Sequence, residues 1–196
     1  MSTVARFASN PRPVHWEAVK QIFCYLAGTH DLWLSYGEAR RTLLVYTDAD
    51  GSIAEDRRAI SGYAFLIDGG AVSWYFKRQE IISLSTTESK YVAATHGLKE
   101  AMWLQSLLSE TFGPFKDATV LFCDNQSAIA LARDHQYHAH TKHIDVCYHF
   151  ICWVIDQGVV RLVYCPTEDM VADALTKALP SPKVKHFAAG LGLRAK

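Results

Sequence analysis

Three aspartates stand at positions that could bring their carboxylates together. Asp48 closes the apolar run TLLVYTDADG, Asp124 closes ATVLFCDN, and Asp173 lies in DMVADALTKAL, shortly after the run VVRLVYCP. Because acids at the carboxyl ends of neighbouring strands can meet at one edge of a sheet, we expect a shared crevice there. Hard carboxylate oxygens with no thiolate beside them suit Mg²⁺. Each aspartate alone is more simply explained by a turn or a helix cap, so the order of the surrounding elements decides.

A lysine stands on the helix face that should turn toward this crevice. The stretch SLSTTESKYVAATHGLKEAMWL predicts the start of a long helix, in which Ser85 and Glu88 form a capping box. Small and apolar residues recur at helical spacing from Ala94 onward, and four residues earlier on that stripe is Lys90. Glu88 lies about 200° away at 3.6 residues per turn. We therefore expect Lys90, and not Glu88, to point inward, where an ammonium needs anions.

Length and composition favour one well-buried domain with an appendage. The chain has 196 residues, of which 49% are hydrophobic. Lys and Arg number 20, as do Asp and Glu, so a polyanionic partner would need a local basic patch. The five cysteines contain no CxxC pair and indicate a reducing compartment. No apolar run approaches the ~20 residues that cross a bilayer, so we expect a soluble intracellular protein without a membrane partner.

The elements that must position these residues follow from periodicity and from turn signals. PVHWEAVKQIFCYLAG predicts an amphipathic helix, and SGYAFLIDGGAVSWYF predicts a hairpin that turns at Asp68-Gly69-Gly70. After the long helix we expect a strand, a helix from Gln126 to about Arg133, a helix from about His143 to Gln157, a strand and a last helix. Three meandering strands followed by strands that alternate with helices predict a mixed α/β sheet. We assign the five tryptophans to core or inter-element packing: Trp16, Trp33, Trp74, Trp103 and Trp153.

Several motifs in this order resemble the ribonuclease H domain that ends the reverse transcriptase polyprotein of copia-type (Pseudoviridae-like) LTR retrotransposons. The motifs are YTDADG, RRAISGYAFLIDGGAVSW, LSTTESKYVAATHGLKEAMWL, CDNQSAIALA, HTKHID, YHFI and YCPTEDMVADALTKALP. The resemblance implies a ribonuclease H-like α/β fold with a five-stranded mixed sheet flanked by helices. It implies three regions: 1–40 as the tail of the reverse transcriptase or connection segment, 41–180 as the ribonuclease H domain and 181–196 as a C-terminal tail.

The resemblance also implies a reaction. Members of this family are hydrolases that cleave the RNA strand of RNA–DNA hybrids endonucleolytically during reverse transcription, with two Mg²⁺ or Mn²⁺ ions. Carried over residue by residue, the catalytic and metal-binding carboxylates are Asp48, Asp124 and Asp173. The implied partners are the hybrid and the polymerase domain of the same polyprotein, in cytoplasmic virus-like particles or in the nucleus.

The fourth carboxylate of the family is missing from its expected position. A glutamate is expected two residues after the capping acid, and this chain has Lys90 there, with Glu88 as a less favoured substitute. An ammonium repels Mg²⁺ and cannot ligate it, so we expect impaired hydrolysis. The alternative is a catalytically inactive hybrid-binding or scaffolding module from a decayed element. Three positions that commonly carry arginine in the family support decay, because single C-to-T or G-to-A changes would explain all of them: His140, Cys147 and Cys152.

Polar and basic residues around the predicted crevice could hold nucleic acid. Charged residues flank the hairpin, two amides follow Asp124, and two basic residues open a helix: Arg57, Arg58, Lys77, Arg78, Asn125, Gln126, Lys142 and His143. They could contact phosphates and 2′-hydroxyl groups of a hybrid. The simpler alternatives are solvated turns for the charges and a helix cap for Asn125.

The histidine-rich stretch QYHAHTKHIDVCYHF leaves a third, more distant hypothesis. His140, His143 and Cys147 stand near helical spacing and could form part of a metal-binding module. A zinc site needs four ligands in compact spacing, and this stretch already belongs to the retroelement motif.

Overall fold

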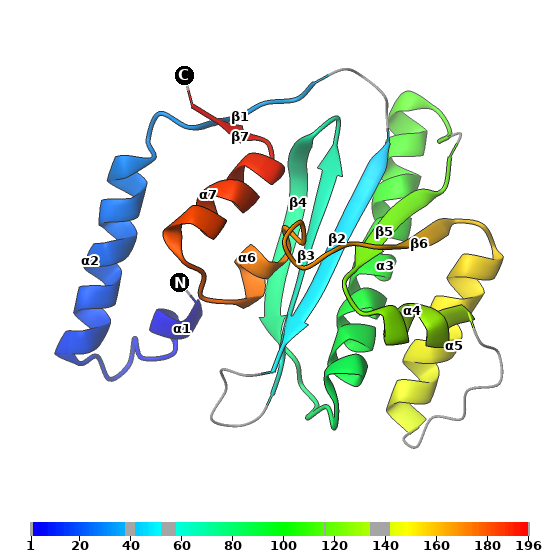
Figure 1. Ribbon diagram of the computed structural model, residues 1–196, viewed down its shortest axis with the longest axis horizontal. Coiled ribbons are helices and arrows are strands. Elements are labelled where there is room, and N and C mark those ends of the chain that lie inside the picture. Colours follow the sequence, from blue (N-terminus) through cyan, green and yellow to red (C-terminus); the bar gives the residue numbers. More distant parts are fainter. Residues whose placement is uncertain (1, 38–41, 52–57, 116, 134–141, 196) are drawn as a thin grey trace. The chain divides into compact units, whose positions relative to one another are not determined.

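The computed structural model describes residues 2–37, 42–51, 58–115, 117–133 and 142–195 (Figure 1). The chain divides into two compact units, Met1–Trp33 with Leu193–Lys196, and Leu34–Gly192. The second unit contains the large sheet and all three aspartates of interest. The region boundaries that the family resemblance implies stay a prediction.

The second unit is built on a five-stranded mixed sheet with the order β4-β3-β2-β5-β6. Its strands are β2 (Leu43–Asp50), β3 (Ile60–Ile67), β4 (Gly70–Arg78), β5 (Thr119–Cys123) and β6 (Val160–Tyr164). The first three form an antiparallel meander, whereas β5 pairs parallel with both β2 and β6. Asp68 and Gly69 adopt positive φ angles of 51° and 80° in the turn between β3 and β4. The predicted five-stranded sheet and its hairpin are confirmed.

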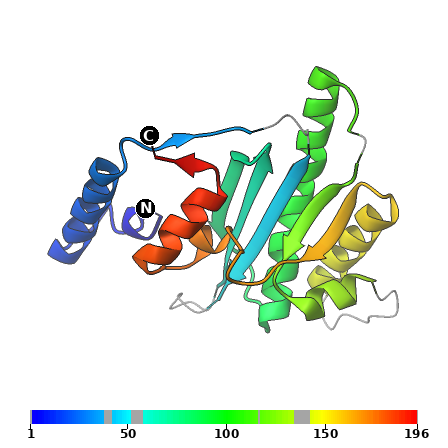
Figure 2. The same cartoon turned by 45° about the horizontal axis from the view of Figure 1, so that its top comes forward.

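Helices cover both faces of this sheet. The helices α3 (Thr86–Phe112), α4 (Gln126–Arg133) and α5 (Lys142–Asp156) lie on one face, and α6 (Asp173–Thr176) and α7 (Ser181–Gly190) lie on the other (Figures 1 and 2). Two glycines permit the close approach. A Cβ on Gly97 of α3 would stand 2.8 Å from Thr47 Cγ2, and a Cβ on Gly62 of β3 would stand 2.7 Å from Thr176 Cγ2. Side chains of a strand alternate between faces, so Gly62 meets α6 while its neighbour Tyr63 faces α3.

The long helix α3 begins at the predicted capping box and ends at Phe112. The hydroxyl oxygen of Ser85 accepts a hydrogen bond from the Glu88 N–H at 3.1 Å, and the Glu88 carboxylate accepts one from the Leu84 N–H at 2.7 Å. Gly113 follows the helix with a φ of 87°. The stripe of small and apolar residues packs against the sheet, and Leu98 and Ala101 are fully buried there.

The last helix before Pro180 is shorter than the sequence indicates. DMVADALTKAL predicts one continuous helix, but only Asp173–Thr176 is helical, and Lys177 is extended with φ −122° and ψ 149°. A second helix, α7, follows within the residues assigned to a tail. The short element α6 therefore acts as a single turn that carries Asp173 and Lys177 to the sheet edge.

The first unit consists of α1 (Ser2–Ala5), α2 (Pro13–Gly28), the start of β1 (Trp33–Leu34) and β7 (Leu193–Arg194). The helix α2 has the predicted bounds, and none of its residues is buried. We expected the tryptophans in the core or in packing between elements, and the core part of that expectation is wrong, because their exposed fractions lie between 45% and 59%. Indole is large and rarely buried completely, which makes it a weak marker of the core. Among the described residues, no helix is both long and apolar enough to cross a membrane.

Candidate active site

The three aspartates meet at one edge of the sheet. Asp48 lies in β2, Asp124 directly follows β5, and Asp173 opens α6. The parallel register pairs Tyr46 with Phe122, so the next inward step along each strand brings positions 48 and 124 together. One carboxylate oxygen from each aspartate lies within 4.8 Å of the other two. Since Asp48 is fully buried and Asp173 is 2% exposed, their charges need partners.

Lys90 supplies one of those partners. Its ammonium lies 3.1 Å from Asp48 Oδ1 and also donates a hydrogen bond to Asp124 Oδ1. Only 14% of the Lys90 side chain is exposed. Glu88, in contrast, is held at the start of α3 by its bond to the Leu84 N–H and makes no contact of this kind. The helix register therefore directs position 90 into the carboxylate cluster and position 88 away from it.

Lys177 supplies the second partner, which sequence reasoning missed. Its ammonium lies 2.8 Å from Asp173 Oδ1 and 3.2 Å from Asp48 Oδ2. The Thr176 hydroxyl donates a further hydrogen bond to Asp48 Oδ2. The available signal was the spacing of four residues between Asp173 and Lys177, which places an acid and a base on one face of a helical turn.

The pKa values of the cluster follow from burial and from these ion pairs. Burial alone would raise the pKa of Asp48, but Lys90, Thr176 and Lys177 outweigh it and lower that pKa below its usual range. The pKa of Asp173 is raised to about 6, chiefly by burial. Repulsion from Asp48 also raises it, whereas the ion pair with Lys177 lowers it. Burial would lower the pKa of Lys90, yet its bonds to Asp124 and Asp48 raise it. Burial would lower the pKa of Lys177 too, yet Asp173 and Asp48 raise it, so both lysines remain charged at neutral pH.

The amides after Asp124 have structural partners. Asn125 Oδ1 accepts a hydrogen bond from the Ala128 N–H at 3.0 Å, which caps α4, and its Nδ2 donates to Thr87 Oγ1 at 3.4 Å. Gln126 is exposed at the first turn of α4. The capping alternative for Asn125 is thus observed, and it leaves the exposed Gln126 available to a ligand.

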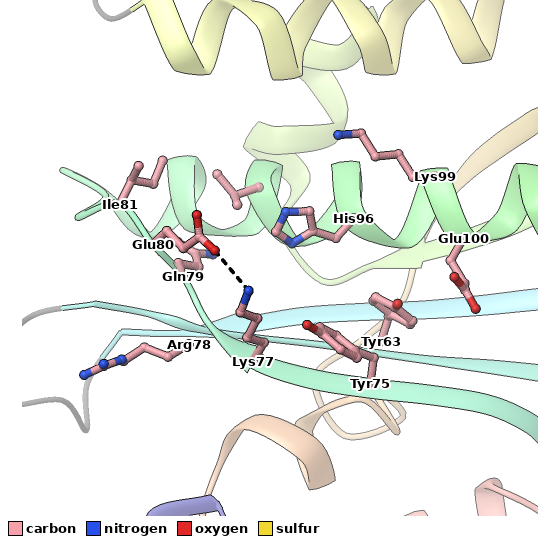
Figure 3. A pocket seen from close by; sticks show the side chains of 11 residues that line it. Tyr63, Tyr75, Lys77, Arg78, Gln79, Glu80, Ile81, His96, Lys99 and Glu100 are labelled. Carbon is pink, nitrogen blue, oxygen red and sulfur yellow. Dashed lines mark hydrogen bonds and ion pairs between the residues drawn. The ribbon is translucent and has the colours of Figure 1, made fainter. Parts of the chain in front are cut away.

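Two basic residues of the hairpin, Lys77 and Arg78, border a separate groove between β4 and α3 (Figure 3). The groove encloses about 520 Å³, and Tyr63, Tyr75, His96 and Glu100 are among its lining residues. Lys77 pairs with Glu80 across 3.0 Å, and 55% of the Lys77 side chain stays exposed. The groove is lined by side chains of both charges.

The remaining predicted contacts are only partly placed. Arg78 ends β4, and Arg58 is partly buried before β3. Arg57 lies outside the described residues, and Lys142 and His143 open α5 with side chains that are not described. Their roles in nucleic-acid binding stay predictions.

The histidine and cysteine hypothesis rests largely on residues outside the described part of the chain. His140 is not described, and the side chain of His143 is not described either. Cys147 is buried and packs against Val92 and Ile81. Within the described residues, the group of acids, histidines and cysteines close enough to hold a metal ion is the aspartate trio.

Comparison with solved structures identifies the fold. A crystal structure of LC11-RNase H1 in complex with an RNA/DNA hybrid superposes with a TM-score of 0.52 and 16% sequence identity, over 69% of this chain and 94% of that chain. The protein therefore has a ribonuclease H-like fold.

Sequence comparison identifies the family. The chain is 44% identical over 185 residues to the retrovirus-related Pol polyprotein from transposon TNT 1-94 of Nicotiana tabacum, covering 93% of this chain and 14% of that polyprotein. It is 33% identical over 196 residues to the Pol polyprotein from transposon RE1 of Arabidopsis thaliana, covering 98% of this chain and 13% of that polyprotein. No protein-family model matches the sequence. This chain is an RNase H-like domain homologous to the C-terminal region of copia-type retrotransposon Pol polyproteins, as the motifs predicted.

Proposed function

We propose that this chain is a ribonuclease H domain that acts on the RNA strand of RNA–DNA hybrids during reverse transcription, and that Lys90 impairs hydrolysis in this copy. The observation that carries the proposal is the aspartate trio, whose carboxylate oxygens lie within 4.8 Å of one another. The family relation supports it, and so does the hybrid bound to LC11-RNase H1. By the same relation, the partners would be the hybrid and the polymerase domain of the polyprotein. The place would be a cytoplasmic virus-like particle, or the nucleus.

The donor chemistry of the trio fits a hard divalent cation. Asp48, Asp124 and Asp173 offer only carboxylate oxygens at closely spaced positions. Two Mg²⁺ or Mn²⁺ ions bound there would activate a water molecule and stabilise the leaving 3′ oxygen of the RNA strand. Asp48 would hold such a cation together with Asp124 and Asp173. Its Oδ1 lies beside Lys90, which also contacts Asp124, and its Oδ2 lies beside Lys177, which also contacts Asp173. Thr176 holds Asp48 in this orientation.

Lys90 opposes that chemistry for two reasons. Its ammonium has no lone pair and cannot replace a carboxylate ligand. Its charge also lies among the oxygens that would bind the cation, at 3.1 Å from Asp48 Oδ1. At an effective dielectric constant of ~20, two unit charges about 4 Å apart interact by ~4 kcal/mol before desolvation. The ammonium, tethered by the helix, already neutralises part of the cluster, and its charge repels an incoming Mg²⁺.

A hybrid-binding module without hydrolysis is the second candidate, and the pairing of Lys90 favours it. The ammonium pairs with Asp48 and Asp124, so these buried charges have a counter-ion without a metal cation at that position. Contacts to phosphates and 2′-hydroxyls would come from outside the carboxylate cluster. The candidates for these contacts remain Arg57, Arg58, Lys77, Arg78, Asn125, Gln126, Lys142 and His143.

Cleavage of a labelled hybrid separates the two candidates. With Mg²⁺, the unmodified chain should cleave the RNA strand weakly or not at all, and Lys90→Glu should restore cleavage by returning a carboxylate to the inward face. Asp124→Asn in the Lys90→Glu background should abolish it. Glu88→Gln is the matched control, since it removes a carboxylate two residues away that only caps α3. A folded Lys90→Glu that stays inactive, together with an unmodified chain that loses cleavage on Glu88→Gln, would make Glu88 the ligand.

Binding tests the part of the proposal that both candidates share. The unmodified chain should bind a hybrid more tightly than duplex DNA, and its affinity should fall as salt rises because phosphate contacts release counterions. Equally weak binding of both nucleic acids at low salt would contradict both candidates.

A further inference from the structure

Asp48 is shared between two ammonium groups, one on each carboxylate oxygen. Lys90 takes Oδ1 at 3.1 Å, and Lys177 takes Oδ2 at 3.2 Å. Each lysine also contacts a second aspartate, which is Asp124 for Lys90 and Asp173 for Lys177. The carboxylate of Asp48 thus lies between two positive groups, each paired with a further aspartate. The lysines therefore stand at the two places where cations are stabilised by this cluster.

The two ammonium groups differ in how firmly they are held. Lys90 projects from the second turn of the 27-residue helix α3, and 14% of its side chain is exposed. Lys177 follows a four-residue helix, has an extended backbone and keeps 27% of its side chain exposed. Lys177, directly after α6, is therefore more accessible to solvent than Lys90 on α3.

We propose that Lys177 is a tethered counter-ion that holds Asp48 and Asp173 together until a divalent cation binds, and that it must leave these oxygens for the cation to enter. Lys177 is thus a positioning residue that sets metal affinity. This inference rests on the proposed metal-dependent function and goes beyond it, because it assigns a role to a residue that carries no carboxylate.

Competition for the same lone pairs supports the inference. The ammonium lies 2.8 Å from Asp173 Oδ1 and 3.2 Å from Asp48 Oδ2, so it occupies the space between these two oxygens. A Mg²⁺ ion binds carboxylate oxygens at about 2.0–2.1 Å and would need that space. Thr176 does not compete in this way, because it is a neutral donor that can keep its bond to Asp48 while a cation binds. The cluster therefore favours one cation, internal or external, between Asp48 and Asp173.

Metal titration of matched variants tests the inference without relying on cleavage. All variants carry Lys90→Glu, and Mn²⁺ binding is measured by calorimetry. Lys177→Gln should bind Mn²⁺ about tenfold more tightly than Lys90→Glu alone, because a competing cation is removed. Its melting temperature without metal should be lower, since Asp48 and Asp173 lose their counter-ion. Lys177→Arg keeps the charge and should bind Mn²⁺ as weakly as Lys90→Glu. Lys183→Gln, an exposed change on α7, is the control and should alter neither value.

A purely structural lysine would behave differently, because Lys177→Gln would then leave Mn²⁺ affinity unchanged or weaken it. Either result overturns the inference. A second measurement keeps Lys177 in place, in case the glutamine variant does not fold. In Lys90→Glu, the ammonium NMR signal of Lys177 should shift or disappear as Mg²⁺ is added, and a signal that does not change as Mg²⁺ saturates its site would equally overturn the inference. Absence of metal binding in every variant would overturn the proposed metal site as well, which distinguishes the two failures.

Discussion

Two lysines of this chain make ion pairs of nearly equal length in unlike surroundings. Lys77 lies 3.0 Å from Glu80 at the groove, and Lys90 lies 3.1 Å from Asp48 in the carboxylate cluster. The side chains of the first pair are 55% and 84% exposed, whereas those of the second are 14% and 0% exposed. Distance alone would rank the pairs as equals. Exposure separates them, because water screens the first pair and is excluded from the second.

The pKa values show the same contrast. A hydrogen bond to Glu80 and the attraction of its charge raise the pKa of Lys77, with almost no opposing burial. Burial is the largest influence on the pKa of Lys90 and would lower it, yet two aspartates reverse that effect. Both lysines are charged, but only Lys90 keeps its charge against a large opposing effect of burial, which its partners outweigh. Removing one member of the buried pair should therefore destabilise the fold more than removing one member of the exposed pair.

The largest expected effect comes from breaking the buried pair. Lys90→Met should lower the free energy of unfolding by about 3 kcal/mol or more, because it leaves Asp48 and Asp124 without the cation that offsets their desolvation. Urea denaturation at neutral pH and without divalent ions measures this. A loss below about 1 kcal/mol would mean that the cluster is solvated like the surface pair.

A smaller effect is expected from the pH dependence of Asp173. Its pKa is raised from 3.8 to about 6, so the folded protein keeps a proton there that the unfolded chain releases. As pH rises from about 4 to about 6, the contribution of this carboxyl to the free energy of unfolding therefore decreases. Asp173→Asn cannot ionise, so its stability relative to the unmodified chain should rise by about 1 kcal/mol over that interval. Urea midpoints at pH 4 and pH 7 test the sign, and a difference that falls with pH would contradict it.

The smallest effect is expected at the exposed pair. Lys77→Met should leave the urea midpoint unchanged within error, because the Lys77 and Glu80 side chains are both mostly solvated. Glu80→Gln serves as the reciprocal variant and should be equally silent. A marked destabilisation by either change would remove the contrast between the two pairs.

The sequence predicted the parts of the site that regular periodicity controls. Asp48 and Asp124 follow from the ends of two strands, and parallel pairing brings such ends to one edge. Lys90 follows from the 3.6-residue period of α3, which its capping residues Ser85 and Glu88 fix in register. These inferences need only local patterns and one rule of sheet geometry.

The sequence did not predict what depends on irregular backbone. The spacing of Lys177 from Asp173 was visible in DMVADALTKAL, but the contact of Lys177 with Asp48 depends on where the short helix α6 lies against the sheet, and that helix ends at Thr176 instead of continuing. This contact joins residues that are far apart in the sequence, and a local sequence pattern cannot predict such a contact. The exposure of Trp74 and Trp103 was missed for a related reason, since the hydrophobicity of a residue does not predict which face of its helix or strand packs against the rest of the protein.

Thermal unfolding in the presence of Mg²⁺ tests the central claim most directly, which is that the Lys90 ammonium stands where the family binds a cation. A ligand that binds only the folded state stabilises it in proportion to the logarithm of one plus its concentration divided by its dissociation constant, and so raises the melting temperature. The melting temperature of the unmodified chain should change little at millimolar Mg²⁺. Without metal, Lys90→Glu should melt at a lower temperature than the unmodified chain, and its melting temperature should rise as Mg²⁺ is added. The account would be contradicted if Mg²⁺ raised the melting temperature of the unmodified chain but did not raise that of Lys90→Glu.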